Sequence, residues 1–66
     1  MKELIGLKVK VTFFDSMGFQ SLVGYVMDVV DGFIVIQGLT KLNGVMYINL
    51  TKVKMINIMN EENNEA

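Results

Sequence analysis

The sequence predicts an all-β fold: a small, strongly bent barrel of five antiparallel strands, with at most one short helical turn at its N-terminus. Short segments that alternate apolar and polar residues, or are apolar throughout, fill most of the 66-residue chain, and this pattern is typical of strands. Turns marked by glycine separate the segments. One segment also contains an internal glycine, which indicates the sharp bend that a small barrel requires.

The first strand is predicted over residues 7–14. Apolar and mostly polar positions alternate along it, as in a strand with one buried face. Leu7, Val9, Val11 and Phe13 share one face, and Lys8, Lys10, Thr12 and Phe14 share the other. Asp15 and Gly18 follow at the first and fourth positions of a turn, where the aspartate can bond to the main chain and glycine suits the exit.

The second strand is predicted over residues 21–30, with its bend at Gly24. Alternation places Leu22, Val26 and Val30 on one face and Val23, Tyr25, Met27 and Val29 on the other. The dipeptide Asp31-Gly32 predicts a two-residue hairpin, which leads into a third strand over residues 33–37.

A looser connection is expected over residues 38–44, then a fourth strand over 45–50, a turn at Thr51-Lys52 and a fifth strand over 53–59. We predict a single small β-barrel domain over residues 1–59 and a disordered acidic tail over residues 60–66, because the tail offers nothing to bury. The second and third strands are apolar on both faces, so we expect a second buried surface between subunits.

Composition favours association between copies of the chain. A domain of this size buries only about 60% of the surface of its unfolded chain, yet 52% of the residues are hydrophobic. Cysteine and histidine are both absent, so neither a disulfide nor the usual structural zinc site can supplement the core. We therefore expect a homo-oligomer with no cofactor and no metal.

Charge and hydropathy indicate a soluble cytoplasmic protein with no membrane partner. No stretch approaches the ~20 apolar residues of a membrane helix, and residues 1–6 lack the apolar core of a signal peptide. Residues 1–60 hold six lysines and four acidic residues, a net charge of +2, which permits binding to a polyanion. Abundant lysine, isoleucine, asparagine and methionine without arginine suit an AT-rich bacterial or phage genome.

The order of these features resembles the Sm-like family, which includes the eukaryotic Sm and LSm proteins and bacterial Hfq. The first Sm motif resembles an ordered set of segments in this chain: residues 9–13, Asp15 and Gly18, residues 24–26, an acidic hairpin and residues 33–36. Residues 46–50, running through a tight turn into residues 53–58, occupy the place of the second motif. The resemblance implies rings of five to seven subunits, joined by pairing of fourth and fifth strands, that bind single-stranded RNA near the pore.

The chain departs from the family at the RNA-binding motifs. Gly32 and Phe33 stand where the family has an asparagine in the loop after the second strand. The Arg-Gly of the eukaryotic second motif is absent, and Tyr47-Ile48-Asn49 keeps only the tyrosine of the Tyr-x-His of Hfq. A similar order of five strands, with a glycine-bent second strand, also occurs in PRC-barrel domains.

Four residues near the matching loops are candidates for RNA binding. Phe33 and Tyr47 could stack on bases, Asn49 could bond a base edge, and Lys52 could hold a phosphate. The structural alternative is that Phe33 and Tyr47 are buried between subunits, and that Asn49 and Lys52 only shape a turn.

A basic patch is a second candidate surface. Lys8 and Lys10 share a face of the first strand, and Lys52 and Lys54 share a face of the last. In a closed barrel these two strands are neighbours, so the four lysines could form one patch for a polyanion. Alternatively, the lysines keep edge strands soluble and discourage aggregation.

Nothing in the sequence indicates an enzyme. Asp28 and Asp31 lie close in sequence, but a lone carboxylate pair without histidine, cysteine or a phosphate-binding loop does not make a catalytic site. We expect a homo-oligomeric Sm-like protein, in the form of a ring, that binds or scaffolds single-stranded RNA. The alternative function is a small β-barrel module for protein association and assembly, with no nucleic-acid binding.

Overall fold

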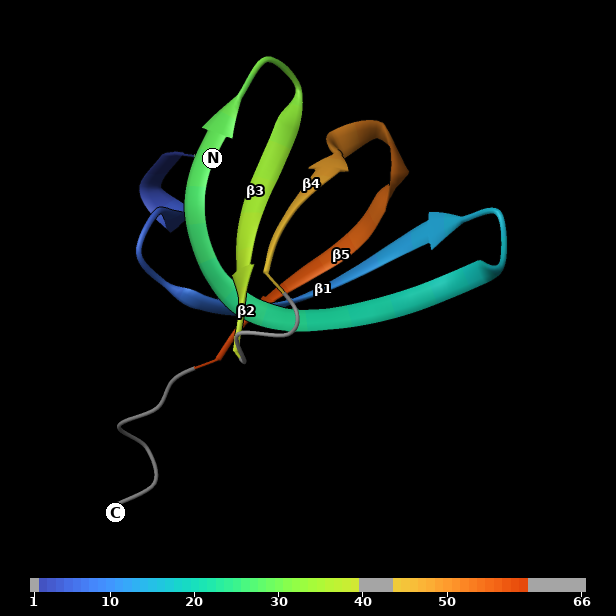
Figure 1. Cartoon of the computed structure of the whole chain (residues 1–66), viewed down its shortest axis with the longest axis horizontal. Helices are drawn as coiled ribbons and strands as arrows, with labels where there is room; N and C mark the ends of the chain where they lie inside the picture. The colour runs from blue at the N-terminus through green and yellow to red at the C-terminus, as the bar shows by residue number, and fades with distance from the viewer. Residues whose placement is uncertain (1, 40–43, 60–66) are drawn as a thin grey trace.

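Five antiparallel strands and two short 3₁₀ turns make up the computed structural model, which describes residues 2–39 and 44–59. In chain order the elements are η1 (Lys2–Leu4), β1 (Lys8–Asp15), β2 (Gly18–Val30), β3 (Phe33–Gly38), β4 (Val45–Asn49), η2 (Leu50–Lys52) and β5 (Val53–Ile58) (Figure 1). The predicted all-β fold is confirmed. The second strand begins three residues earlier than expected, and the acidic tail predicted over residues 60–66 lies outside the described residues.

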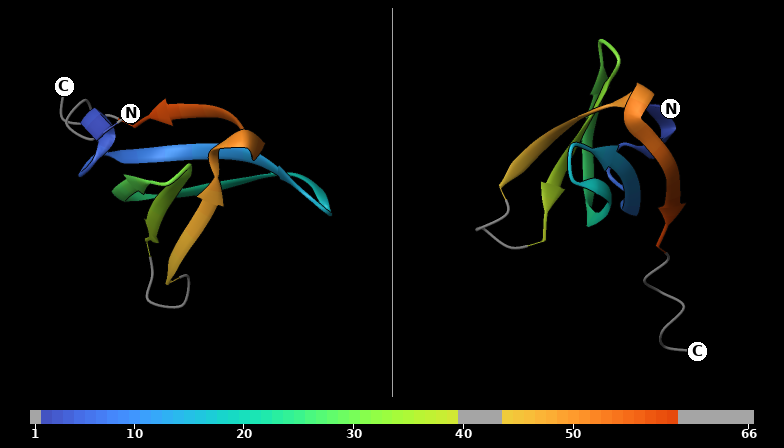
Figure 2. Two further views of the ribbon diagram at one scale, coloured as in Figure 1. Left: turned by 90° about the horizontal axis from the view of Figure 1, so that it is seen from above. Right: turned by 90° about the vertical axis from the view of Figure 1, so that its right-hand side faces the viewer.

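The strands form one sheet in the order β4-β3-β2-β1-β5. As expected, the first and last strands are neighbours, and Val11 pairs with Ile56 in the middle of their ladder. The sheet is strongly bent, but among the described residues β4 and β5 form its two edges and do not pair with each other. Both strands leave η2 in diverging directions (Figure 2), so the barrel is open between them and the expected closure is not confirmed.

The bend of the sheet lies in β2, which curves through the whole molecule (Figure 1). Its first part, from Gly18 to Tyr25, pairs with β1, and its second part, from Gly24 to Val30, pairs with β3. Gly24 stands where the two ladders overlap. A Cβ atom at this position would clash with the carbonyl oxygen of Gln37 and lie 2.7 Å from Cγ2 of Ile36. Glycine is therefore required because the backbones of β2 and β3 approach closely here.

A β-bulge at Met27 changes which face of β2 the later residues occupy. The pairing with β3 shifts between Val26 and Asp28, so Met27 is an extra residue in the ladder. Val29 is consequently buried, and Val30 is exposed. The expectation that Val30 shares the inner face of Val26 is therefore wrong, because simple alternation does not anticipate the inserted residue.

Both predicted tight turns are confirmed. The carboxylate of Asp15 accepts a hydrogen bond of 2.8 Å from the main-chain N–H of Met17, and Gly18 has a φ of 106°. Asp31 and Gly32 have φ values of 53° and 81°, as the two central residues of a type I′ hairpin require. These turns fix the registers of the β1–β2 and β2–β3 hairpins.

The hydrophobic core lies within the curve of the sheet. It consists of buried valine and isoleucine residues from the first four strands: Val9, Val11, Val26, Val29, Ile34, Ile36 and Ile48. Leu4 of η1 and Leu50 of η2 pack against it from two sides. The first four strands therefore each bury one face in this core, and Val53 and Ile56 of β5 pack against it. On the opposite face of the sheet many apolar side chains are exposed, although Val35 is buried.

We expect Gly24→Ala to lower the free energy of unfolding by about 1–3 kcal/mol, because the methyl group must displace the Gln37 carbonyl or the Ile36 side chain. Urea unfolding followed by circular dichroism, at one fixed protein concentration, measures the change.

Gly32→Asn is the matched control, since Gly32 has open space around it and asparagine tolerates a positive φ. Asparagine at a φ of 81° is strained but meets no neighbouring atom, so this control should lose less stability than Gly24→Ala. A Gly24→Ala protein as stable as the control would contradict the close approach of β2 and β3.

Candidate nucleic-acid interface

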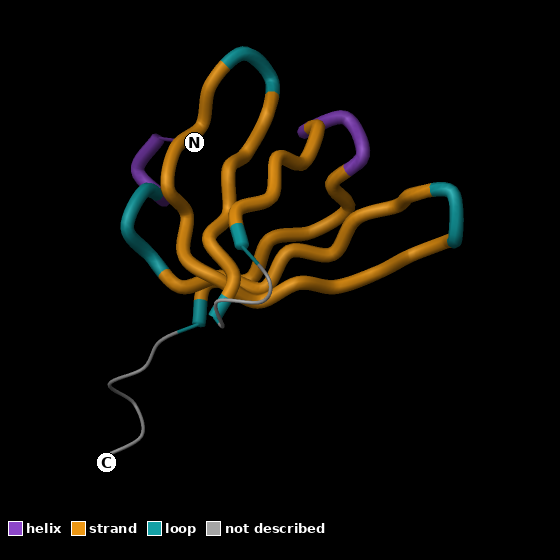
Figure 3. The backbone as a smooth tube through the Cα atoms, viewed as in Figure 1, coloured by secondary structure: helices purple, strands orange, loops and turns teal. Residues whose placement is uncertain are grey.

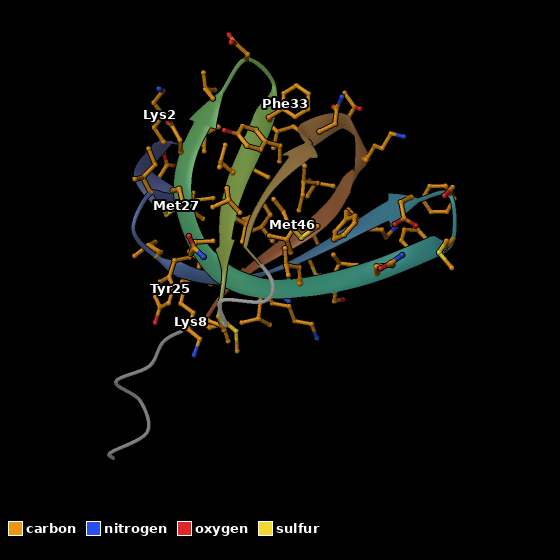
Figure 4. All side chains as sticks on the ribbon, viewed as in Figure 1. Lys2, Lys8, Tyr25, Met27, Phe33 and Met46 are labelled. Carbon is orange, nitrogen blue, oxygen red and sulfur yellow. The ribbon has the colours of Figure 1, made fainter. Side chains whose placement is uncertain are left out.

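Three of the four RNA-binding candidates share the outer face of the β3–β4 ladder. Phe33 lies directly opposite Asn49, and Tyr47 lies opposite Val35, one pair farther along the same face. Figure 4 shows Phe33 at the end of the sheet where the β2–β3 turn and η2 lie. The structure therefore brings two aromatic rings and one amide side chain together, as the sequence-based hypothesis requires.

The two rings are accessible in the single chain. Tyr47 is 67% exposed and Phe33 is 37% exposed, whereas Val35 between them is buried. Flat rings on an open face can stack on nucleobases. They can equally pack against a neighbouring subunit, which was the structural alternative for these two residues.

Asn49 is already engaged by the turn that follows it. Its side-chain oxygen accepts hydrogen bonds from the main-chain N–H of Thr51 at 2.9 Å and from the Thr51 hydroxyl at 2.8 Å, so Asn49 is the N-cap of η2. Only its amide nitrogen is left to face a ligand. The turn-shaping role proposed as the alternative for Asn49 thus has direct structural support.

Lys52 ends η2 and is exposed. The start of η2 is fixed to the β2–β3 turn, since the N–H of Leu50 donates to the carbonyl oxygen of Gly32 at 2.8 Å. This contact holds Lys52 at the same end of the molecule as Phe33. Lys52, Phe33 and Asn49 therefore lie at one end of the sheet, and Tyr47 lies two residues before Asn49 on β4.

The four lysines of the proposed basic patch separate into two pairs. Lys10 lies opposite Asn57, near the end of β5, and the carbonyl oxygen of Lys8 accepts the N–H of Met59 at 2.9 Å. Lys52 and Lys54 flank the start of β5, which lies beside Phe13. Lys52 belongs to η2 rather than to β5, and Lys54 is an extra residue in the β1–β5 ladder. Strand alternation therefore does not determine whether their side chains share a face.

Sequence reasoning missed an aromatic cluster near the tip of the β1–β2 hairpin. The rings of Phe14 and Phe19 pack edge to face with centroids 5.1 Å apart, and Nζ of Lys54 lies 5.8 Å from the centroid of Phe19. The signal was present in the sequence: Phe14 is an apolar residue on the face that otherwise holds Lys8, Lys10 and Thr12.

The acidic residues of β2 and its turn have local structural roles. The carboxylate of Asp28 accepts a hydrogen bond of 2.8 Å from the N–H of Val29, next to the bulge, and Asp31 is the first of the two central residues of the type I′ turn. Within residues 2–39 and 44–59, no three metal-ligating side chains gather into a site. None of the helical turns in this part of the chain has the length needed to cross a membrane.

Asn49→Ala should lower the free energy of unfolding by about 1 kcal/mol, because the N–H of Thr51 loses its acceptor. Asn49→Asp keeps a side-chain oxygen at the same position and should stay close to the wild type. Parallel urea titrations of the three proteins compare them. Equal loss in both variants would show that the cap contributes nothing.

Comparison of the chain with protein-family models, with curated proteins and with solved structures finds no match in any of the three.

Proposed function

We propose that this protein is a homo-oligomeric, Sm-like small barrel whose subunits join edge to edge through β4 and β5. The observation that carries the proposal is the open sheet, which ends in two edge strands of similar length, Val45–Asn49 and Val53–Ile58. An unpaired edge strand presents a row of N–H and C=O groups that can pair with another chain.

Hydrogen bonds of known direction identify which groups face the open side of each edge. On either side of β4, the carbonyl oxygen of Gly44 accepts a hydrogen bond from Gly38, and the N–H of Leu50 donates one to Gly32. Both bonds point toward β3, so alternation turns the N–H and C=O groups of Val45 and Tyr47 to the open side of β4. The N–H of Met59 donates to the carbonyl oxygen of Lys8 in β1. The same alternation therefore turns the N–H and C=O groups of Ile56 and Ile58 to the open side of β5. Each edge therefore offers donors and acceptors at two-residue intervals.

The residues of these edges do not discourage pairing. Proteins usually protect an edge with charged residues, proline or a bulge that faces the open side. β4 contains no charged residue and no proline. In β5 the one charged residue, Lys54, is also the bulge, and it lies at the start of the strand, so the stretch from Met55 to Ile58 is regular and uncharged. Val45, Tyr47, Met55 and Ile58 are also exposed on these strands, so pairing would remove apolar surface from water as well as satisfy the main chain.

Pairing of β4 with β5 joins two different edges. Such a contact is head to tail, and it produces a closed ring when the rotation between subunits closes, or a filament when it does not. The Sm-like resemblance favours a ring of five to seven subunits. Pairing of β4 with β4 would instead give a two-fold dimer.

Single-stranded RNA binding is the second candidate function. It is favoured by the exposed rings of Tyr47 and Phe33, which lie on one face with the exposed cation Lys52 near them. Stacking and phosphate contacts are what single-strand binding needs. In an assembly, this face would be repeated once for each subunit, and the alternative function is the same assembly without nucleic acid.

Ile58→Pro tests the edge pairing. Proline removes an N–H that faces away from β1, so the β1–β5 ladder is retained while pairing with a neighbouring chain loses a donor. We expect the mass measured by light scattering on the eluting protein to fall toward that of one subunit. Ile58→Val keeps the N–H group and should retain the wild-type mass; a wild-type protein that elutes as a monomer would refute edge-to-edge assembly.

The RNA-binding candidate is tested by the double substitution Tyr47→Ala/Lys52→Ala. Loss of one stacking ring and one cation should weaken binding of single-stranded RNA by roughly tenfold or more, without a change in mass. Recording absorbance at 260 and 280 nm during the same elution shows any nucleic acid that copurifies, since the chain has no tryptophan and two tyrosines. Unchanged affinity would count against this face as the RNA site.

A further inference from the structure

The tip of the β1–β2 hairpin carries exposed aromatic residues that the fold does not need. Phe14 is 52% exposed and Phe19 is 61% exposed, and they lie opposite each other in the β1–β2 ladder. The ladder between β1 and β5 ends at the pair Phe13 and Val53, so no third strand accompanies the tip. Figure 3 shows the hairpin extending beyond the rest of the sheet.

These rings are held in place without being buried. They contact each other edge to face at a centroid distance of 5.1 Å and an interplanar angle of 67°. The turn next to them is fixed by Asp15, whose carboxylate accepts hydrogen bonds from Gln20 Nε2 at 2.7 Å and from the N–H of Met17 at 2.8 Å. Exposed aromatic side chains that are ordered in this way are typical of a binding surface.

One lysine lies beside the rings, and a second lies four residues away along β1 on the same face. Nζ of Lys54 lies 5.8 Å from the centroid of Phe19, and alternation places Lys10 on the same outer face of β1 as Phe14. Between Lys10 and Phe14, the hydroxyl groups of Thr12 and Ser21 lie 3.3 Å apart. A cation beside a ring can contact a phosphate while a base stacks on the ring face.

Within the described residues, no carboxylate lies on the outer face of the β1–β2 hairpin. Alternation places Asp15 on the same inner face as Phe13, where its carboxylate accepts a hydrogen bond from Gln20. The other three acidic residues of the described chain lie elsewhere: Glu3 in η1, Asp28 beyond the bend of β2 and Asp31 in the β2–β3 turn. The surface therefore complements a polyanion, and it would repel the same lysines on a second copy of the chain.

We propose that Phe14, Phe19, Lys10 and Lys54 form a binding surface for single-stranded nucleic acid, which we call the hairpin platform. Bases stack on the two phenylalanine rings, and the two lysines contact the phosphates between them. Stacking on a ring accepts any base. The platform thus binds with little sequence preference and with an affinity that falls as salt is raised.

The hairpin platform is separate from the β3–β4 face that contains Phe33 and Tyr47. Its residues come from β1, β2 and β5, whereas those of the other face come from β3 and β4. The inference therefore does not depend on the proposed edge-to-edge assembly or on the RNA candidate above, and substitutions on one surface leave the other intact.

Fluorescence anisotropy with labelled single strands of about 15 nucleotides, oligo(U) and oligo(dT), tests the platform on the full chain. We expect Phe14→Leu/Phe19→Leu to weaken binding by roughly tenfold or more, because leucine preserves apolar bulk but removes the flat ring. Lys54→Gln should weaken binding and reduce the dependence of affinity on salt. Tyr25→Leu is the matched control, because it removes an exposed ring that belongs to neither candidate surface, and it should retain the affinity of the wild type.

Light scattering on each variant separates nucleic-acid binding from self-association. Weaker binding by the double leucine variant, at unchanged mass, supports the platform. Loss of assembly in this variant would identify the hairpin as a contact between subunits and overturn the proposal. Equal affinity in the wild type and the double leucine variant, or no measurable binding by the wild type at low salt, would also overturn it.

Discussion

The close approach of two backbones at Gly24 is the constraint on which the rest of this structure depends. β2 pairs with β1 before this residue and with β3 after it, so one strand holds both halves of the sheet. Any side chain at this point would meet the carbonyl oxygen of Gln37. The bend then wraps the sheet around a core of valine and isoleucine residues, and the later bulge at Met27 turns Val29 inward to complete it.

The same bend explains why so much apolar surface stays outside. A sheet that curves around a small core buries one face of each strand, and in this chain the open side of the curve lies between β4 and β5. Figure 4 shows Met46 near the interior, whereas Tyr25 and Met27 lie on the outer side of β2. Self-association and nucleic-acid binding are two ways in which this outer surface would be used: the first through the main-chain edges of β4 and β5, the second through side chains on the face of the sheet.

Much of the fold could be predicted from sequence because it is determined locally. Asp15, Gly18, Asp31 and Gly32 specify turns through their own conformational preferences, and alternation specifies the strands between them. The two bulges could not be predicted, because an extra residue at Met27 or Lys54 depends on the register with the neighbouring strand, β3 for Met27 and β1 for Lys54. That is why the face of Val30 was misjudged and why the contact between Lys54 and Phe19 was missed. For the candidate site, loop matching brought Phe33, Tyr47 and Asn49 together correctly, but it could not show that Asn49 caps η2.

The hairpin tip differs from the rest of the sheet in local stability. Beyond the pair of Phe13 and Val53 only two strands remain, and a two-stranded ribbon without a core is marginally stable in water. Its main-chain hydrogen bonds should open at a lower free-energy cost than those of β1 and β2 nearer the core, and their amide protons should exchange faster. Phe14 and Phe19 therefore lie on a two-stranded hairpin whose twist can change when a ligand binds, and this change would leave the bend at Gly24 undisturbed.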